Sequence, residues 1–173
     1  FAAWLMVIYL VFILIRQHRN LRIGLLFAFS LFFYYKSSGI FFVLLIISTI
    51  MNFLLGNAIF RSEQNGNRKA WLWFSVIFNL GMLGYYKYTN FLIDTVNAIG
   101  SSTGFGGGIA FRDIFLPVGI SFFTFQAMSY TIDIYRRKMK PVGSIFDFGF
   151  FLSFFPQLVA GPIVRAADFI PQI

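Results

Sequence analysis

The chain has 173 residues, of which 58% are hydrophobic and only 12% are charged, and its net charge is +8. Soluble chains carry about 25% charged residues, so this composition excludes a soluble globular domain. The lysines and arginines lie in short gaps between apolar blocks, where they act as topology signals, and we expect no nucleic-acid partner. Cysteine is absent, which excludes disulfides and cysteine-ligated metal, and no metal site is expected.

The first half of the chain predicts three apolar segments. The first, 2–15, is shorter than the roughly 20 residues that a membrane span needs, and Phe1 already begins the apolar run. We therefore expect the chain to be a fragment whose start is missing. A basic loop follows, and the segments 23–35 and 40–60 then form a helical hairpin around the turn-like residues 36–39.

The middle of the chain predicts a span, an interfacial helix and a linker. A polar loop is expected at 61–69, because it contains Asn65-Gly66-Asn67, and a fourth span at 70–86. Residues 87–99 place polar and apolar side chains on opposite faces, which is typical of an amphipathic helix in the membrane interface. The glycine- and serine-rich stretch 100–108 is expected to be a flexible connector.

The last third predicts a fifth span at 114–135 and an apolar block at 145–164 that is broken by Pro156 and Gly161-Pro162. Irregular backbone at membrane depth survives only inside protein or beside a wet cavity. A kinked span and a broken or re-entrant helix lining a cavity both remain open. The expected fold is an all-α polytopic transmembrane bundle of about five spans, a broken or re-entrant sixth segment and one interfacial amphipathic helix, in a single membrane domain covering 1–173.

Alternate loops are basic, which predicts the orientation. The loops after spans one, three and five carry clusters of cations: Arg16, Arg19 and Arg22; Arg61, Arg68 and Lys69; Arg136, Arg137, Lys138 and Lys140. The intervening loops carry Lys36, and then Lys87 and Arg112 offset by two aspartates. By the positive-inside rule the odd-numbered loops are cytoplasmic and the N-terminus is outside.

Polar residues inside the spans form two sets. Ser48, Asn52 and Gly56 repeat every four residues, which together with Asn79 favours close helix packing with an interhelical hydrogen bond. In span five, Gln126, Ser129 and Asp133 share one face that should look into the bundle or a wet cavity. Asp133 also has a simpler interpretation, because Arg136 and Arg137 follow at salt-bridge spacing.

Several of these segments resemble the membrane-bound O-acyltransferase family. The similarity lies in Leu116-Pro117-Val118-Gly119-Ile120-Ser121-Phe122-Phe123-Thr124-Phe125-Gln126, in Asp133-Ile134-Tyr135-Arg136, and in Ser153-Phe154-Phe155-Pro156-Gln157 through Arg165. Within the family, the chain resembles the N-terminal portion of the bacterial branch that O-acetylates alginate. The residues 79–88 and 165–172 also resemble that branch.

The resemblance implies an enzyme of the bacterial cytoplasmic (inner) membrane. It would move an acyl group, most simply acetyl from acetyl-CoA as a cytoplasmic donor, towards an extracytoplasmic polysaccharide, with a periplasmic or surface acetyltransferase as partner. No bound cofactor is expected. The family's catalytic histidine would lie downstream of this chain. The single histidine, His18, lies in a basic loop and matches no catalytic position, so the fragment alone is expected to be inactive.

The expected contribution of this chain is scaffold and cavity wall. The candidates for lining the cavity or binding the donor are Gln157, Arg165, Pro156, Gly161, Pro162, Gln126 and Asp133. Gln157 would hydrogen-bond from the wall, and Arg165 would meet phosphate or carbonyl groups of the donor or serve as an interfacial anchor. A transporter or flippase for a lipid-linked sugar is the main alternative, because broken helices also occur in transporters. A purely structural membrane subunit is the third.

Overall fold

The computed structural model describes residues 19–103, 109–110, 114–161 and 164–172. Every regular element in these ranges is helical, which confirms the all-α prediction. The elements are α2 (Arg19–Ser38), η1 (Gly39–Phe41), α3 (Phe42–Arg61), α4 (Asn65–Thr103), α5 (Ile120–Tyr135), α6 (Ile145–Ser153), α7 (Phe155–Ala160), α8 (Ala166–Phe169) and η2 (Ile170–Gln172).

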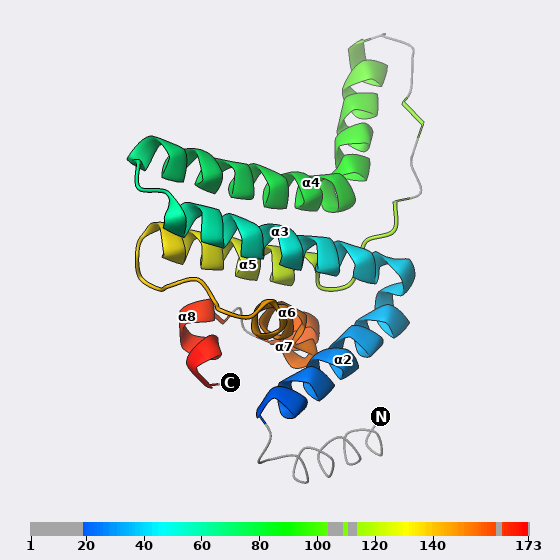
Figure 1. The fold of residues 1–173 in the computed structure, drawn as a ribbon. Coiled ribbons are helices and arrows are strands. Elements are labelled where there is room, and N and C mark those ends of the chain that lie inside the picture. Colours follow the sequence, from blue (N-terminus) through cyan, green and yellow to red (C-terminus); the bar gives the residue numbers. More distant parts are fainter. Residues whose placement is uncertain (1–18, 104–108, 111–113, 162–163, 173) are drawn as a thin grey trace.

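The body of the molecule is a stack of helices around α3. The first part of α4, then α3 and then α5 lie side by side, and α6 packs below them against α2 and α3 (Figure 1). The centre of the stack is aromatic: Phe123, Tyr130, Phe148 and Phe151 are fully buried. The Tyr130 hydroxyl accepts a hydrogen bond from the Val142 backbone N–H at 3.3 Å and so ties α5 to the segment that leads into α6.

The hairpin expected in the first half is present, with its turn shifted slightly. Helix α2 runs on to Ser38, and the chain turns through η1 into α3, so that α2 and α3 form a V (Figure 1). Among the described residues, the stretch Leu21–Arg61, which holds most of α2 and all of α3, is the one long and apolar enough to cross a membrane. Each arm has 20 residues, or about 30 Å of helix, which matches the hydrocarbon core of a bilayer.

Helix α4 corrects two expectations. Asn65-Gly66-Asn67 is its first turn and not a loop, because first-turn N–H groups need no partner within the helix. The helix then continues through the predicted amphipathic segment 87–99 and on to Thr103, so the first residues of the predicted flexible linker are helical. It changes direction along its length, and its last part projects from the stack (Figure 1).

The projecting part of α4 contains the segment 87–99 that was predicted to be an interfacial amphipathic helix. The apolar side chains Phe91, Leu92, Val96 and Ile99 are all exposed. The amide of Asn97 pairs with the returning chain in both directions: it donates to the carbonyl oxygen of Ile109 at 2.9 Å and accepts from the Ile109 N–H at 2.7 Å. This pair fixes where the chain comes back towards α5.

Helix α5 begins later than predicted. It starts at Ile120 and not at residue 114, because Pro117 lacks an N–H and Gly119 adopts a left-handed backbone with φ 74°. A Cβ at Gly119 would also lie 3.1 Å from the carbonyl oxygen of Leu158, so α7 packs directly on this turn. The resulting 16-residue helix is about 24 Å long, shorter than the span that the sequence predicts.

Candidate functional site

The last apolar block is a broken helix, as one of the two sequence alternatives predicts. Helix α6 ends at Ser153, Phe154 leaves helical geometry with ψ 103°, and α7 restarts at Phe155. Pro156 sits in the first turn of α7, where a missing N–H costs nothing. The break therefore lies just before the proline, and it turns the short helix α7 against α2 and α5.

The break brings together two of the candidates from distant parts of the chain. The side-chain amide of Gln126, near the middle of α5, donates to Oε1 of Gln157 on α7 at 2.7 Å. Gln126 is 1% exposed and Gln157 is 9% exposed. The two glutamines are 31 residues apart in the sequence, and their hydrogen bond joins α5 to the short helix that follows the break.

Gly161 keeps Gln157 in this position. It ends α7 in extended backbone, and its N–H donates to the carbonyl oxygen of Gln157 at 3.3 Å. A Cβ at Gly161 would lie 2.6 Å from Cα and 3.2 Å from Cγ of Gln157. Any larger residue would therefore displace the glutamine.

Several buried polar atoms of α5 and α6 have no hydrogen-bond partner among the described residues. They are Oε1 of Gln126 and the hydroxyls of Thr124 on α5 and of Ser153 at the end of α6. Each such atom costs about 1–3 kcal/mol when it is buried without a partner, and native structures contain few of them. Oε1 of Gln126 belongs to the glutamine pair itself, and it can accept a hydrogen bond from a polar group of a ligand or from water.

The remaining candidates are not part of this pair. Asp133 is buried on α5, two helical turns beyond Gln126, and Pro156 and Arg165 are exposed. Arg165 precedes α8, and its backbone carbonyl caps that short helix. Pro162 and His18 lie outside the described residues.

The expected ion pair of Asp133 is not formed. Helix α5 ends at Tyr135, and Arg137 adopts a left-handed backbone with φ 56°. Arg137 therefore departs from the helical geometry of α5, and Arg136 and Arg137 are both exposed. Among the described residues Asp133 has no cationic partner, so the simpler interpretation of this aspartate is wrong.

A second polar cluster joins α3, α4 and α5, and here every group has a partner. Asn52 and Asn79 exchange amide hydrogen bonds at 3.2 and 2.7 Å. Ser75 donates to Oδ1 of Asn52 at 3.2 Å and lies 3.0 Å from the Thr131 hydroxyl. The predicted interhelical bond is thus confirmed. The sequence analysis did not identify Ser75 or Thr131, although Ser75 stands one turn before Asn79.

Close packing along the same helices is also confirmed. A Cβ at Gly56 would lie 2.6 Å from a ring carbon of Tyr130, so α3 and α5 touch through the bare glycine. At the end of the stack, Arg68 of α4 donates to the carbonyl oxygen of Tyr135 at 2.6 Å, and its guanidinium lies 5.2 Å from the Tyr135 ring centre. This contact was not predicted, because Arg68 looked like an ordinary loop cation.

The glutamine pair offers amide groups, which can donate hydrogen bonds to a carbonyl oxygen of a ligand or accept them from a hydroxyl. Among the described residues, no group of three His, Cys, Asp or Glu side chains could hold a metal ion. The arrangement of the pair is suited to binding and positioning.

Comparison with known proteins supplies the context for this site. The chain is 38% identical to the Probable alginate O-acetylase AlgI of Azotobacter vinelandii over 125 residues, which are 72% of the chain and 25% of that protein. It is 36% identical to the protein of the same name from Pseudomonas syringae over 158 residues, 91% of the chain and 30% of that protein.

A further relative carries another name. The Peptidoglycan O-acetyltransferase of Helicobacter pylori is 32% identical over 167 residues, 83% of the chain and 31% of that protein. The chain thus spans between a quarter and a third of the length of these relatives. No family model and no solved structure matches the chain.

These relatives define the class: the chain belongs to the membrane-bound O-acyltransferase family. Within that family it falls in the alginate O-acetylase branch, of which it covers a part. The resemblance noted in the sequence is thereby confirmed.

Proposed function

We propose that this chain is the cavity-wall part of a membrane O-acetyltransferase. The whole protein would move an acetyl group from acetyl-CoA on the cytoplasmic side towards an extracytoplasmic polysaccharide, with a periplasmic or surface acetyltransferase as partner. The observation that carries the proposal is the buried Gln126–Gln157 pair, in which Oε1 of Gln126 has no partner among the described residues. The names of the relatives, which are O-acetylases and an O-acetyltransferase, support the reaction class.

In this proposal Gln157 and Gln126 orient the acyl donor or the acceptor hydroxyl inside the membrane. Gly161 shapes the backbone that holds Gln157, and Pro162, the next residue in the chain, remains a candidate from the sequence alone. Arg165, exposed beyond the break, would meet the phosphates of the donor. Asp133 is a second-rank candidate on the same helix. The base that removes the acceptor proton would be a histidine outside this chain.

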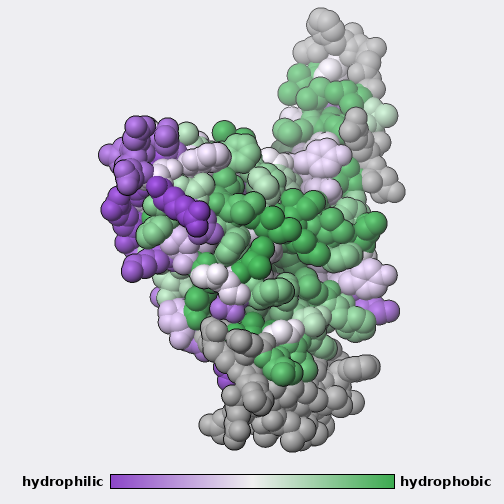
Figure 2. All heavy atoms as spheres, in the orientation of Figure 1, coloured by the Kyte–Doolittle hydropathy of each residue, from purple (hydrophilic) through white to green (hydrophobic). Residues whose placement is uncertain are grey.

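The proposed setting is the bacterial inner membrane, with about five spans, a broken sixth segment and the N-terminus outside. Large apolar side chains are exposed along α3 and α4, including Ile47, Leu54 and Ile77, and such surface covers the visible face of the stack (Figure 2). Hydrophilic residues gather where α3 meets α4 (Figure 2). The Arg68–Tyr135 contact joins this end to the basic residues after α5, which supports one cytoplasmic side for both loops.

Cysteine labelling tests this topology, because the chain has no native cysteine. Ser62→Cys, between α3 and α4, should react with a membrane-impermeant maleimide only from the cytoplasmic side. Ser101→Cys, at the far end of α4, should react from the outside. Labelling of both positions from one side would contradict the five-span arrangement.

The function itself is tested in the full-length protein. Gln157→Leu should lower polysaccharide acetylation about tenfold or more at unchanged protein abundance, since an oriented hydrogen bond in a dry site contributes at least that factor. The matched control is Gln64→Leu, which changes an exposed glutamine between α3 and α4 and should leave acetylation intact. Normal acetylation by the Gln157→Leu protein would favour a purely structural role for this chain.

A transporter or flippase for a lipid-linked sugar remains the alternative, because the α6–α7 break is also a device of transporters. The two proposals differ in the acceptor. If Gln157→Leu stops export of unmodified polymer, transport is favoured. If polymer is exported in normal amount but without acetyl groups, the acetyltransferase is favoured.

A further inference from the structure

Asp133 places a carboxylate inside the helix stack, close to the end of α5. Its side chain is 6% exposed, and among the described residues it forms no hydrogen bond or ion pair. Burial of an ionised carboxylate without a partner is strongly unfavourable, and a buried charge is stable only when it is paired. The carboxylate of Asp133 therefore needs a partner that the described residues do not provide.

The cations nearest to Asp133 in the chain do not meet this need. Arg136 and Arg137 follow the end of α5 and are exposed. Arg68 of α4 is buried, but its guanidinium lies 5.2 Å from the Tyr135 ring centre and donates to the Tyr135 carbonyl oxygen. Residues two positions apart in a helix do not face the same way. Arg68 therefore lies on the side of α5 that Tyr135 faces, away from Asp133.

Asp133 shares a face of α5 with Gln126. The two residues are seven positions apart, which is about two helical turns or 10.5 Å along the axis. On this face Gln126 bonds to α7, and α8 also packs against α5. Neither carboxylate oxygen of Asp133 is among the fully enclosed atoms that have no partner. The carboxylate is thus buried within the stack but still within reach of the end of an arriving side chain.

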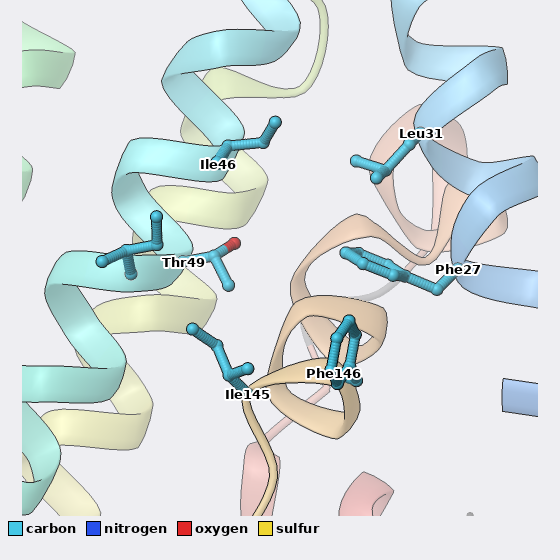
Figure 3. A pocket seen from close by; sticks show the side chains of 7 residues that line it. Phe27, Leu31, Ile46, Thr49, Ile145 and Phe146 are labelled. Carbon is cyan, nitrogen blue, oxygen red and sulfur yellow. The ribbon is translucent and has the colours of Figure 1, made fainter. Parts of the chain in front are cut away.

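This carboxylate specifies its partner more narrowly than the apolar surfaces of the molecule do. For comparison, a groove of about 170 Å³ between α2, α3 and α6 has apolar walls (Figure 3), and its single hydroxyl, of Thr49, is already bonded within α3. Such walls accept any apolar group. A buried carboxylate instead selects a cation, because a cation alone compensates its charge.

Two arguments indicate that this cation belongs to the protein and not to a ligand. The chain spans 25% to 31% of the length of the relatives described above, so most side chains of a protein of that length lie outside it. The proposed acyl donor, acetyl-CoA, carries phosphates, and phosphates attract cations but cannot neutralise a carboxylate.

We propose that Asp133 pairs with an arginine or lysine from the part of the longer protein that lies outside this chain. This ion pair docks that part against the face of α5 that also carries Gln126. The inference rests on the proposed function in one respect, the negative charge of the donor. Its test measures the stability of the protein and not acetylation, so the two proposals can fail separately.

The test is a charge-swap scan in the full-length protein. Asp133→Asn keeps the shape of the side chain and removes its charge, which leaves the partner cation buried alone. The abundance in the membrane should fall several-fold, and the melting temperature in detergent should fall with it. Asp133→Arg should lower both further. In the Asp133→Arg protein, each arginine and lysine outside residues 1–173 is then changed in turn to aspartate. One of these changes should restore about half of the wild-type abundance or more.

The matched control is Asp94→Arg, because Asp94 is an exposed aspartate on the projecting part of α4. This change should leave the abundance and the melting temperature as they are in the wild type. The change to aspartate that rescues Asp133→Arg should lower the abundance of the Asp94→Arg protein.

Three outcomes would overturn the ion pair. Wild-type abundance and melting temperature of Asp133→Asn would mean that the charge has no partner. Rescue of Asp133→Arg by no residue outside 1–173 would exclude a partner from the rest of the protein. Lower acetylation by Asp133→Asn at unchanged abundance and melting temperature would mean that the carboxylate acts on a ligand. If the rescue succeeds while the Gln157→Leu protein acetylates normally, the ion pair stands and the cavity-wall proposal fails alone.

Discussion

The two buried polar clusters of this molecule use the same kinds of side chain in opposite ways. Between α3, α4 and α5, Asn52 and Asn79 bond to each other, and Ser75 bonds to both Asn52 and Thr131. Around the α6–α7 break, Gln126 and Gln157 share one bond while an acceptor of Gln126 stays open. A cluster in which every polar group is paired fixes how the helices pack. A buried acceptor without a partner can instead bind a polar group of a ligand.

The largest effect on stability is expected in the paired cluster. Asn79→Leu removes both hydrogen bonds between the two amides in the core of the stack, so Asn52 keeps only its bonds to Ser75 and Ser48. The free energy of unfolding should fall by about 1–3 kcal/mol, measured as a lower melting temperature in detergent and lower abundance. Asn52→Leu combined with Asn79→Leu should cost less than the sum of the single changes. Purely additive effects would contradict the reciprocal pairing.

Replacing a residue of the Gln126–Gln157 pair should lower activity more than stability. Gln126→Leu removes the unpartnered Oε1 of Gln126 but also leaves Oε1 of Gln157 without its donor. These two effects offset each other in part, so the free energy of unfolding should fall by less than it does in Asn79→Leu. Acetylation by the full-length protein should nevertheless fall about tenfold, because Gln157 loses the amide that orients it. A protein that loses stability as Asn79→Leu does, with activity falling only in proportion to abundance, would show that both clusters are structural.

A smaller effect is expected from the glycine that positions Gln157. Gly161→Ala introduces a Cβ against the glutamine backbone and should lower acetylation several-fold, by about 1 kcal/mol of transition-state stabilisation. Gly143→Ala is the matched control, because nothing lies within 4 Å of its Cβ position. Equal activity of the two variants would mean that the exact place of Gln157 is unimportant.

The smallest effect is expected at the exposed end of the site. Arg165→Ala should raise the KM for the acyl donor about threefold with little change in kcat, because a solvated cation contributes under about 1 kcal/mol to a phosphate contact. Arg165→Lys retains the charge and should keep most of the affinity. Unchanged kinetics of Arg165→Ala at unchanged abundance would remove this residue from the donor site.

Much of the fold follows from residues with strong local preferences. The turn near Gly39 and the break near Pro156 were predicted. Glycine permits backbone conformations that other residues avoid, and proline fixes φ and lacks an N–H, whatever their tertiary surroundings. The late start of α5 has the same cause, because Pro117 and Gly119 are visible in the sequence as residues that interrupt a helix. By contrast, Asn65-Gly66-Asn67 looked like a loop because composition does not distinguish a loop from the first turn of a helix.

The candidate site was predicted in part for a different reason. Gln126 and Gln157 each stood out as polar residues in apolar segments, but their pairing depends on how α7 is turned after the break. Ser75 and Thr131 are ordinary in a helix and become informative only when α4 and α5 are placed side by side. Asp133 lost its expected partners because α5 ends at Tyr135. The local sequence pattern predicts the helices, whereas the packing of the helices determines which polar side chains pair.

The reciprocal amide pair also bears on how the protein enters its membrane. Helices α3 and α4 are consecutive in the chain, and each satisfies the asparagine of the other without help from any later segment. A newly made hairpin can therefore leave the insertion machinery with these amides already shielded from lipid. The contacts of Ser75, Arg68 and Gly56 to α5 wait for the next segment to be synthesised. The order of the helices along the chain is thus also a workable order of assembly.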